Sequence, residues 1–492
     1  MTTQTSTKYE VVIGLEVHIQ LKTRSKMFCG CDREYFDAEP NTHVCPVCLG
    51  MPGTLPVINQ EAVASTILAG LALNCDIPAY AKFDRKNYPY PDLMKGYQIT
   101  QFDQPFCLNG TLEIEVEGAR RDVHLERIHL EEDTARLLHR DNGIETYSLM
   151  DVNRAGSPLM ELVTKPDMHS AAEAGAFLRT LRQVMRYLRI ADADMEKGGM
   201  RCDANVSLRP FGQAELGRKV EVKNMNSFRS VQRAIEFEIE RQSKMLDAGT
   251  RIVQETRGYV DATGETVSQR SKEEASDYRY FPEPDLPPVL VSPETIETLR
   301  ARLPELPAAR LARFQSQYGL TIDEARILTE SRADGDAFEE AVAIAGPEQA
   351  RNVAHWFTGE VARHLNTVGG EAELTDTKVT ARHIGDLVRL VAANAITAAT
   401  AKDVLDVAFE SGDLPEAIID ARGLRQVTDA GAIDEVAQRV LAANPKAVED
   451  YRGGKQSAIG FLVGQVMREM KGRADANAAA DTLRRHLDAA GG

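Results

Sequence analysis

The sequence predicts an α+β protein, with a strand-rich N-terminal domain built on a mainly antiparallel sheet and then all-α helical and tail domains. Strand-like alternation of apolar and polar residues recurs through the first part of the chain. Beyond the proline cluster at 282–288, alanine becomes common and short helical patterns replace the strands. We therefore expect domains at 1–293, 294–398 and 399–492.

The first strand is the clearest element in the sequence. From Tyr9 to Leu21 every odd position is apolar, whereas Glu16 and His18 fall on even positions. Because successive side chains of a strand point to opposite faces, Glu16 and His18 share the non-core face of the sheet. Taken alone, a strand histidine is more often a hydrogen-bonded neighbour than a ligand.

Further strands follow from the same alternation. Residues 112–125 alternate around Gly118 and predict a hairpin. The apolar parity slips at 126–127, which indicates a β-bulge of the kind often found beside active sites. We expect strands 147–153 and 159–163 to pair with each other, and another hairpin at 256–270.

Ser170 and Glu173 form a capping-box pattern before an amphipathic helix. A second amphipathic helix is expected at 227–246 and ends near Gly249. The remaining expected elements are helices at 61–73, 322–330 and 350–365, a strand at 200–208, a loop at 82–92 and a small C-terminal bundle at 415–422, 433–444 and 457–471.

Composition and charge limit the classes of function. The 492 residues carry a net charge of −16, which argues against generic binding along nucleic-acid backbones but leaves room for a local basic patch. The N-terminus is polar, and no run of about 18 apolar residues occurs, so neither a signal peptide nor a membrane helix is indicated. We expect a cytoplasmic protein.

Four of the seven cysteines form two close pairs, Cys29 with Cys31 and Cys45 with Cys48. This spacing in a polar loop favours a tetrahedral zinc site over four buried apolar thiols. Four thiolates leave no open coordination position, so the zinc is expected to be structural. We expect the other three cysteines, Cys75, Cys107 and Cys202, to be free thiols.

Several carboxylates lie at or beside apolar strand segments. Unpaired carboxylates are costly in such places and indicate a metal, a cationic partner or a tuned acid or base. Together with one imidazole they suit a hard divalent cation such as Mg²⁺, whereas salt bridges to arginines are the alternative. These carboxylates are Glu131, Glu132, Asp133, Glu161 and Asp203.

Two basic segments could contact phosphates. Lys82, Arg85 and Lys86 could clamp phosphates or simply form a solvated charged face. No Walker A loop is present, since 453–456 lacks the required spacing and hydroxyl, and no GxGxxG follows a strand. In the tail, residues 451–473 hold five cations against Glu469 alone, which favours an anionic partner over cations that merely cap helix ends.

Several long motifs, which occur in the order found in the family and span nearly the whole chain, closely resemble those of the B subunit of the aspartyl/glutamyl-tRNA(Asn/Gln) amidotransferases. The motifs are Val12-Ile-Gly-Leu-Glu-Val-His18, Lys82-Phe-Asp-Arg-Lys-Asn-Tyr88, Leu130-Glu-Glu-Asp133, Asp151-Val-Asn-Arg-Ala-Gly-Ser-Pro158, Arg201-Cys-Asp-Ala-Asn205, Asp277-Tyr-Arg-Tyr-Phe-Pro-Glu-Pro-Asp285 and Gly460-Phe-Leu-Val-Gly464.

The resemblance implies an enzyme that uses ATP and Mg²⁺ to phosphorylate the side-chain carboxylate of Glu-tRNA(Gln) or Asp-tRNA(Asn), which ammonia then converts to the amide. Ammonia would come from glutamine hydrolysed by the amidase partner, the A subunit, and a small C subunit would stabilise the heterotrimer. The helical and tail domains would hold the mischarged tRNA. A non-catalytic, zinc-stapled scaffold that presents tRNA, and a ligase that acts alone, are the alternatives.

The resemblance also implies roles for single residues. The metal shell would be Glu16, His18, Glu132, Glu161 and Asp203, with Glu131 as a catalytic neighbour. The loop that binds ATP phosphates and substrate would be Lys82, Arg85, Lys86, Asn87 and Tyr88. The four cysteines match a zinc site that only part of the family has, and the candidate tRNA contacts are Arg452, Lys455, Gln456 and Lys471.

Two positions depart from the family pattern. Pro89 stands where an aromatic residue is usual, and Met94 stands where proline is common. We expect these changes to alter the stiffness of the loop without loss of activity.

Overall fold

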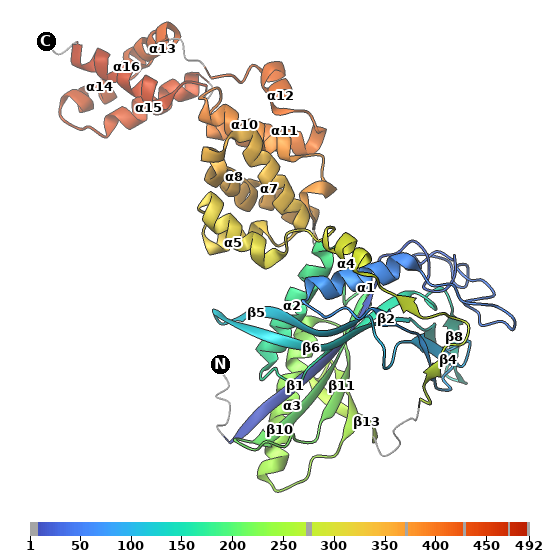
Figure 1. Cartoon of the computed structure of the whole chain (residues 1–492). Coiled ribbons are helices and arrows are strands. Elements are labelled where there is room, and N and C mark those ends of the chain that lie inside the picture. Colours follow the sequence, from blue (N-terminus) through green and yellow to red (C-terminus); the bar gives the residue numbers. More distant parts are fainter. Residues whose placement is uncertain (1–7, 272–277, 370–371, 427–429, 471–472, 490–492) are drawn as a thin grey trace. The chain divides into compact units, whose positions relative to one another are not determined.

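The computed structural model confirms the α+β class and describes residues 8–271, 278–369, 372–426, 430–470 and 473–489. The chain forms two compact units, Met1–Leu306 and Pro307–Gly492, which we describe separately. The first unit contains the sheets and the second is helical (Figure 1).

An eight-stranded sheet forms the centre of the first unit, in the order β13-β12-β11-β10-β1-β9-β6-β5. Its neighbours pair antiparallel except β11 and β12, which run parallel. The strands are β1 (Tyr9–Gln20), β5 (Cys107–Val116), β6 (Ala119–Glu132), β9 (Pro158–Thr164), β10 (Met200–Pro210), β11 (Val220–Met225), β12 (Glu255–Val260) and β13 (Glu265–Ser271).

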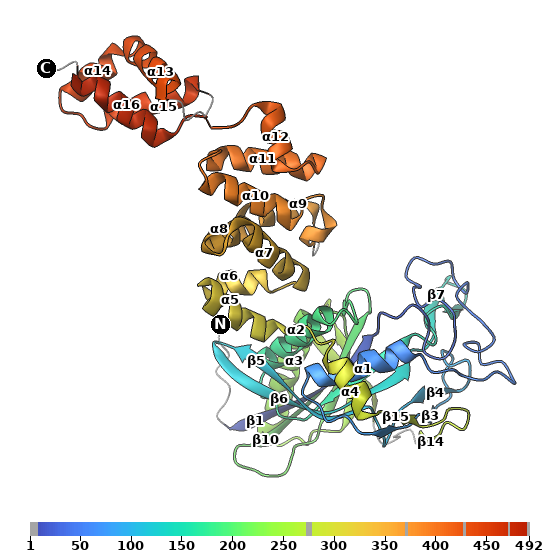
Figure 2. The same cartoon turned by 45° about the horizontal axis from the view of Figure 1, so that its top comes forward.

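Three helices cover the apolar face of this sheet: α1 (Gln60–Ala72), α2 (Ala171–Tyr187) and α3 (Phe228–Asp247) (Figure 2). The odd residues of β1 from Val11 to Ile19 lie in that core, and Ile13, Val17 and Ile19 are fully buried. The sheet therefore has one apolar face and one polar face, as the alternation predicts. A fourth helix, α4 (Pro293–Arg300), packs on α1, so this unit extends past residue 293 to Leu306.

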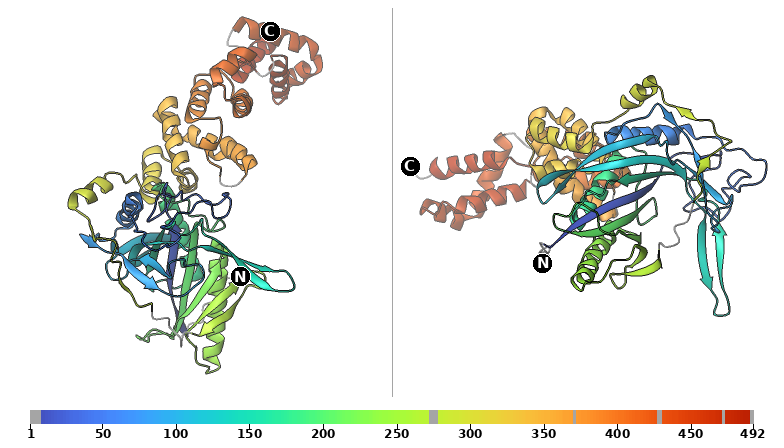
Figure 3. Two further views of the ribbon diagram at one scale, coloured as in Figure 1. Left: turned by 90° about the vertical axis from the view of Figure 1, so that its right-hand side faces the viewer. Right: turned by 60° about the horizontal axis from the view of Figure 1, so that its bottom comes forward.

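Three small sheets complete the first unit. The first has three strands in the order β14 (Phe281–Pro282), β3 (Asp84–Asn87) and β4 (Tyr97–Thr100). The other two are the pairs β15 (Val289–Leu290) with β2 (Tyr80–Ala81) and β7 (Arg136–Asp141) with β8 (Thr146–Asp151). The β7–β8 ribbon projects from the unit in both views of Figure 3.

Two expectations about these strands were wrong. The expected loop at 82–92 contains β3, because its backbone finds partners in β4 and β14. Strands β8 and β9 do not pair with each other; β8 pairs with β7, whereas β9 lies between β1 and β6. Both errors concern non-local pairing, which the spacing of residues along one strand does not specify.

Other local expectations are confirmed. β5 and β6 form a hairpin that turns at Glu117 and Gly118, both with positive φ. The register of β6 against β9 shifts between Leu125 and Arg127, which is the expected bulge. Ser170 caps α2 by accepting from the Glu173 amide, but the Glu173 carboxylate accepts from the amide of His169, so the cap differs from a standard capping box.

The helical unit has two hydrophobic cores. One core gathers buried residues from Phe314 to Ile419 and the other gathers those from Ile433 to Leu487. Its helices are α5 (Pro307–Tyr318), α6 (Ile322–Leu328), α7 (Arg332–Ala345), α8 (Ala350–Trp356), α9 (Ala362–Val368), α10 (Ala381–Ala392), α11 (Ala398–Ser411), α12 (Pro415–Arg422), α13 (Ala430–Ala443), α14 (Pro445–Arg452), α15 (Ala458–Glu469) and α16 (Ala476–Ala489).

The expected three-helix bundle is therefore only partly correct. α12 packs in the first of these cores, through Ile418 and Ile419, while α13 and α15 share the second core with α14 and α16. A π-helical turn at Phe357–Val361 joins α8 to α9 within the expected helix 350–365. None of the helices in the described residues is both long and apolar enough to cross a membrane.

A close contact in the first unit gives a test of the packing. A Cβ added at Gly70 of α1 would lie 2.4 Å from Cys107 Sγ, whereas one added at Gly14 of β1 would make an ordinary contact at 3.7 Å with Pro166. We expect Gly70→Ala to destabilise the sheet unit by about 1–3 kcal/mol through overpacking, and Gly14→Ala to cost less. Calorimetric unfolding of both variants measures this, and equal melting temperatures would contradict it.

Candidate functional site

The polar face of the large sheet brings the predicted acidic residues together. His18 on β1 lies opposite Glu161 on β9, and Glu161 in turn lies opposite His129 on β6. On the other side of β1, Glu16 lies opposite Asp203 of β10. Directly paired residues of neighbouring strands share a face, so residues from four strands meet on one surface.

The first cluster on this face consists of His18, Glu131 and Glu161, whose ligand atoms all lie within 4.8 Å of one another. His18 Nε2 lies 3.2 Å from a Glu161 oxygen and 3.8 Å from a Glu131 oxygen. His129 flanks the same two carboxylates, at 3.3 Å from Glu161 and 3.7 Å from Glu131. One nitrogen and several carboxylate oxygens form a donor set that fits a divalent cation.

Burial and charge together set the protonation of this cluster. Burial acts to lower the pKa of His129, but Glu161 and Glu131 outweigh it and raise that pKa to about 9. Burial likewise opposes the charged form of His18, and its bond to Glu161 still raises the pKa. The imidazoles in turn lower the pKa of Glu161 well below its usual value, despite burial. Two carboxylates can therefore remain ionised side by side.

A second cluster lies beside the first and consists of Glu16, Asp203 and Glu221, again with ligand atoms within 4.8 Å of one another. Lys223 Nζ bonds to Asp203 and lies 3.5 Å from Glu221. Asn205 Nδ2 donates to Glu16 at 3.0 Å. The predicted metal shell is thus divided between two adjacent groups of carboxylates, and the charge of each group is partly offset by a cationic side chain.

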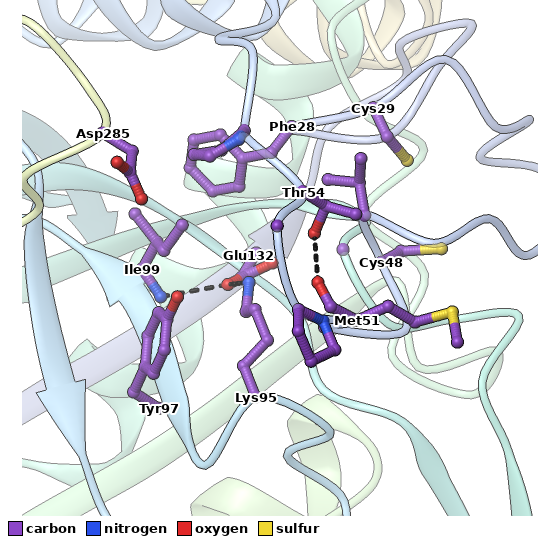
Figure 4. A pocket seen from close by; sticks show the side chains of 16 residues that line it. Phe28, Cys29, Cys48, Met51, Thr54, Lys95, Tyr97, Ile99, Glu132 and Asp285 are labelled. Atoms are coloured by element: carbon purple, nitrogen blue, oxygen red, sulfur yellow. Dashed lines mark hydrogen bonds and ion pairs between the residues drawn. The ribbon is translucent and has the colours of Figure 1, made fainter.

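Glu132 lies outside both clusters. As the neighbour of Glu131 on β6 it points to the opposite face, where its carboxylate pairs with Lys95 and accepts from the amide of Ile99. It lines a pocket of about 210 Å³ that Tyr97 also lines (Figure 4). The structure therefore does not bring Glu132 together with the other residues of the predicted shell, whereas it does bring Glu131.

Asp133 forms salt bridges to arginines, which was the alternative to metal binding for these carboxylates. Its buried carboxylate accepts from Arg201 at 2.9 Å and from Gln20 at 2.7 Å, and Arg154 lies 3.7 Å away. Although burial acts to raise the pKa of Asp133, the two arginines lower it. This ion pair fixes the end of β6 against β1 and β10.

The segment 82–88 places one cation near the first cluster. Burial lowers the pKa of Lys86, but Glu131 together with Tyr280 and Glu161 raises it overall, and within the described residues no hydrogen bond or ion pair of its ammonium group is found. Lys82 instead bonds to Asp84 and Asp103. Lys86 is thus the cation of this segment that remains available to an anionic ligand.

The rest of this segment has structural partners. Arg85 makes a two-bond ion pair with Glu283, at 2.7 and 2.8 Å. Asn87 donates to the carbonyl of Arg279 at 2.9 Å, and Tyr88 packs edge-to-face on Tyr278. These contacts hold the 278–283 segment against β3.

The four cysteines of the two close pairs meet, with their sulfurs within 4.8 Å of one another. All seven cysteines are free thiols. Lys26 is fully buried beside them; its ammonium donates to the carbonyl of His43 at 2.7 Å and lies 3.7 Å from Cys48 Sγ. The hydrogen bond from Cys29 and the charge of Lys26 contribute to a Cys48 pKa of about 4. Four sulfurs at this spacing fit Zn²⁺.

The predicted tRNA contacts lie in the helical unit. Arg452 ends α14, and Lys455 and Gln456 lie in the turn before α15, all exposed. Lys455 forms an ion pair of 3.3 Å with Asp450. Lys471 falls outside the described residues. These side chains form an accessible polar surface, and their role stays a prediction.

Residues that the sequence reasoning missed include His129, Glu221 and Lys223. His129 lies two residues before Glu131 and therefore on the same face, so the strand parity beyond the bulge would have found it. Glu221 and Lys223 flank Val222 in a short alternating strand, which also places both on one face. Their partners lie on β10, which no local pattern identifies.

Comparison with known families supplies independent information. Residues 11–297 match the model described as the GatB/GatE catalytic domain, and residues 336–487 match the model described as the GatB domain. The first match contains both carboxylate clusters and the four cysteines, and the second contains the exposed residues around Lys455.

Curated relatives match along nearly their whole length. The chain is 53% identical over 490 residues to the B subunit of the aspartyl/glutamyl-tRNA(Asn/Gln) amidotransferase of Dehalococcoides mccartyi, covering 98% of this chain and 99% of the relative. It is 54% identical over 468 residues to the protein of the same name from Thermomicrobium roseum, covering 95% and 96%. The Carboxydothermus hydrogenoformans protein of that name is 50% identical over 481 residues, covering 98% and 99%.

The cysteine cluster predicts a metal content. We expect the purified chain to hold one zinc ion, and Cys48→Ser to lose it because a thiolate ligand is removed. Elemental analysis and the absorption of Co²⁺-substituted protein measure this. Cys75→Ala is the matched control, since Cys75 is a buried thiol outside the cluster; zinc retained by the Cys48 variant would contradict the assignment.

The raised pKa of His129 predicts a pH dependence of stability. Because this pKa rises from 6.5 to about 9 on folding, protonated His129 stabilises the fold fully below pH 6.5, and the contribution is lost as the pH rises through 9. In magnesium-free buffer, the unfolding free energy of the unsubstituted chain minus that of His129→Gln should fall by on the order of 1–3 kcal/mol between pH 6 and pH 10. A difference that is constant or grows with pH would exclude this account.

Proposed function

The chain belongs to the family of aspartyl/glutamyl-tRNA(Asn/Gln) amidotransferase B subunits, and we propose that it carries the site at which the mischarged amino acid is amidated. The proposed substrates are ATP and Glu-tRNA(Gln) or Asp-tRNA(Asn). The observation that carries the proposal is the pair of carboxylate clusters on the polar face of the sheet, with the Lys86 ammonium group nearby.

A free carboxylate does not react usefully with ammonia, because hydroxide is a poor leaving group. In the proposed reaction a side-chain carboxylate oxygen of the mischarged residue attacks the γ-phosphorus of ATP and displaces ADP. Ammonia then attacks the carbonyl carbon of the acyl phosphate, and phosphate leaves. The first step concentrates negative charge, so the site must supply cations in fixed positions.

The two clusters offer side chains that could bind a cation to offset this charge. Bound Mg²⁺ would offset the charge of the transferring phosphoryl group, and His18, Glu131 and Glu161 would hold it. Glu16, Asp203 and Glu221 offer a second set of oxygens. Lys86 presents its ammonium group to the same region and would bind phosphate oxygens.

The curated relatives are named as B subunits, which supports a complex with further subunits. We propose that the amidase partner, the A subunit, is the source of ammonia, and that a small C subunit stabilises the heterotrimer. Zn²⁺ at the four cysteines would fasten the loop that lines the Glu132 pocket, since Cys29 and Cys48 are among its lining residues. In the tail, the exposed Arg452, Lys455 and Gln456 would contact the tRNA.

Substitution of the cluster tests this function. We expect His18→Ala and Glu161→Gln each to lower amidation by about 100-fold or more, with glutamine and with free ammonia alike, because both routes need the acyl phosphate. The assay follows amide formation and ADP release in the reconstituted complex. Glutamine hydrolysis by the partner should persist.

The control is Lys22→Ala, which removes an exposed ion pair with Asp192 on the edge of the same unit. This variant should amidate at the normal rate. Full amidation with ammonia in both cluster variants would reject the proposal and would favour a scaffold that only presents tRNA.

A further inference from the structure

Four aromatic side chains form a continuous row beside the first carboxylate cluster. Tyr88 contacts Tyr278 edge-to-face at 5.7 Å, and Tyr278 contacts Tyr280 in the same way at 6.0 Å. Tyr280 then stacks on Phe102, with ring centroids 4.2 Å apart and planes inclined by 7°. Segments from three parts of the chain therefore build one aromatic wall.

The row ends in an exposed aromatic side chain, Phe102. Phe102 is 55% exposed although one face of its ring lies against Tyr280, so a large part of this side chain away from Tyr280 is open to solvent. A single exposed aromatic residue needs no explanation. Here, however, the parallel stack presents a flat surface to which a further planar ring can add, which is how proteins hold nucleobases.

The other end of the row lies beside Lys86, the lysine proposed to bind phosphate. Lys86 Nζ lies 5.0 Å from the centroid of Tyr278 and 5.9 Å from that of Tyr88. Burial raises the pKa of Tyr280, and the negative charges of Glu131 and Glu161 raise it further, so this ring lies within the field of the first cluster. The wall thus leads from the cation that can bind phosphate to the exposed side chain of Phe102.

We propose that Phe102, backed by Tyr280, is the stacking platform for an adenine ring at this site. The proposal rests on the proposed function. Two substrates of that reaction carry an adenine that could stack here. The adenine of ATP would stack here if its phosphates were bound by Lys86, and the 3′-terminal adenosine of the tRNA carries the amino acid that must reach the same cluster. Stacking is tolerant of the attached group, so the experiment separates the two sources.

A tryptophan probe tests the platform directly. The chain has a single tryptophan, Trp356, which lies in the helical unit, so Phe102→Trp adds an indole at the platform. The emission of the reconstituted complex is compared with that of the unsubstituted complex, so that other tryptophans cancel. The ligands are Mg-ATP, Mg-tripolyphosphate, uncharged tRNA, and the same tRNA without its 3′-terminal adenosine.

Stacked adenine quenches indole emission. Quenching by ATP but not by tripolyphosphate supports the platform with ATP as its ligand. Quenching by intact tRNA but not by the shortened tRNA supports it with the terminal adenosine. Quenching by neither, or equal quenching by ligands with and without the adenine, overturns it. The matched control is Phe281→Trp, because Phe281 is also exposed but lies against Arg85.

Kinetics provide a second readout. Phe102→Ala should raise the KM for the ligand that quenches by about 5- to 100-fold, with a much smaller change in kcat, and Phe102→Tyr should restore it. An unchanged KM would overturn the platform while leaving the proposed function intact, provided that Glu161→Gln is inactive. Full amidation by Glu161→Gln would instead reject the proposed function, whatever Phe102 does.

Discussion

The position of β1 between β9 and β10 is the constraint on which the rest of the sheet unit depends. Its odd-numbered side chains from Val11 to Ile19 are buried in the core under the helices, so the register of β1 cannot slip by one residue without exposing them. The same register places His18 opposite Glu161 and Glu16 opposite Asp203. The burial of one face of β1 thus fixes the positions of the polar side chains on the other face.

Charge balance explains why these carboxylates can be held so close together. Ionised carboxylates without partners would be very costly at this depth. His129 lies against Glu131 and Glu161, and Lys223 against Asp203, so each cluster carries its own compensating cation. In the proposed function, these cations would keep the oxygens in place before Mg²⁺ binds, which would reduce the reorganisation that binding requires. They would also compete with Mg²⁺ for the carboxylates, so the affinity of the proposed site would be a balance of the two.

The strand alternation of 9–21, the bulge and the cysteine pairs could be predicted because each is a local pattern. The choice between Glu131 and Glu132 could not, because it depends on the parity of β6 beyond the bulge at Leu125, and one residue more or less reverses the face. Lys82 and Arg85 were equal candidates with Lys86 in the sequence. Lys82 bonds to Asp84, two residues away, and to Asp103, whereas Arg85 pairs with Glu283, which lies far away in the sequence. Because no local pattern predicts which acids these cations choose, only the fold, as far as the chain is described, shows that Lys86 is the one of the three that remains available.

Glu131 and Glu132, consecutive residues at the end of β6, point to opposite faces of the sheet. Glu131 belongs to the carboxylate cluster, whereas Glu132 lines the pocket that Cys29 and Cys48 also line. Lys26 ties that cysteine loop to the chain after β8, through the carbonyls of His43 and Val152. Zinc bound by the cysteines, as proposed, would therefore stabilise the loop beside the pocket that Lys95 and Glu132 line. Because Glu131 and Glu132 are consecutive residues of β6, the same strand end positions one residue of the carboxylate cluster and one residue of the pocket beside the cysteine loop.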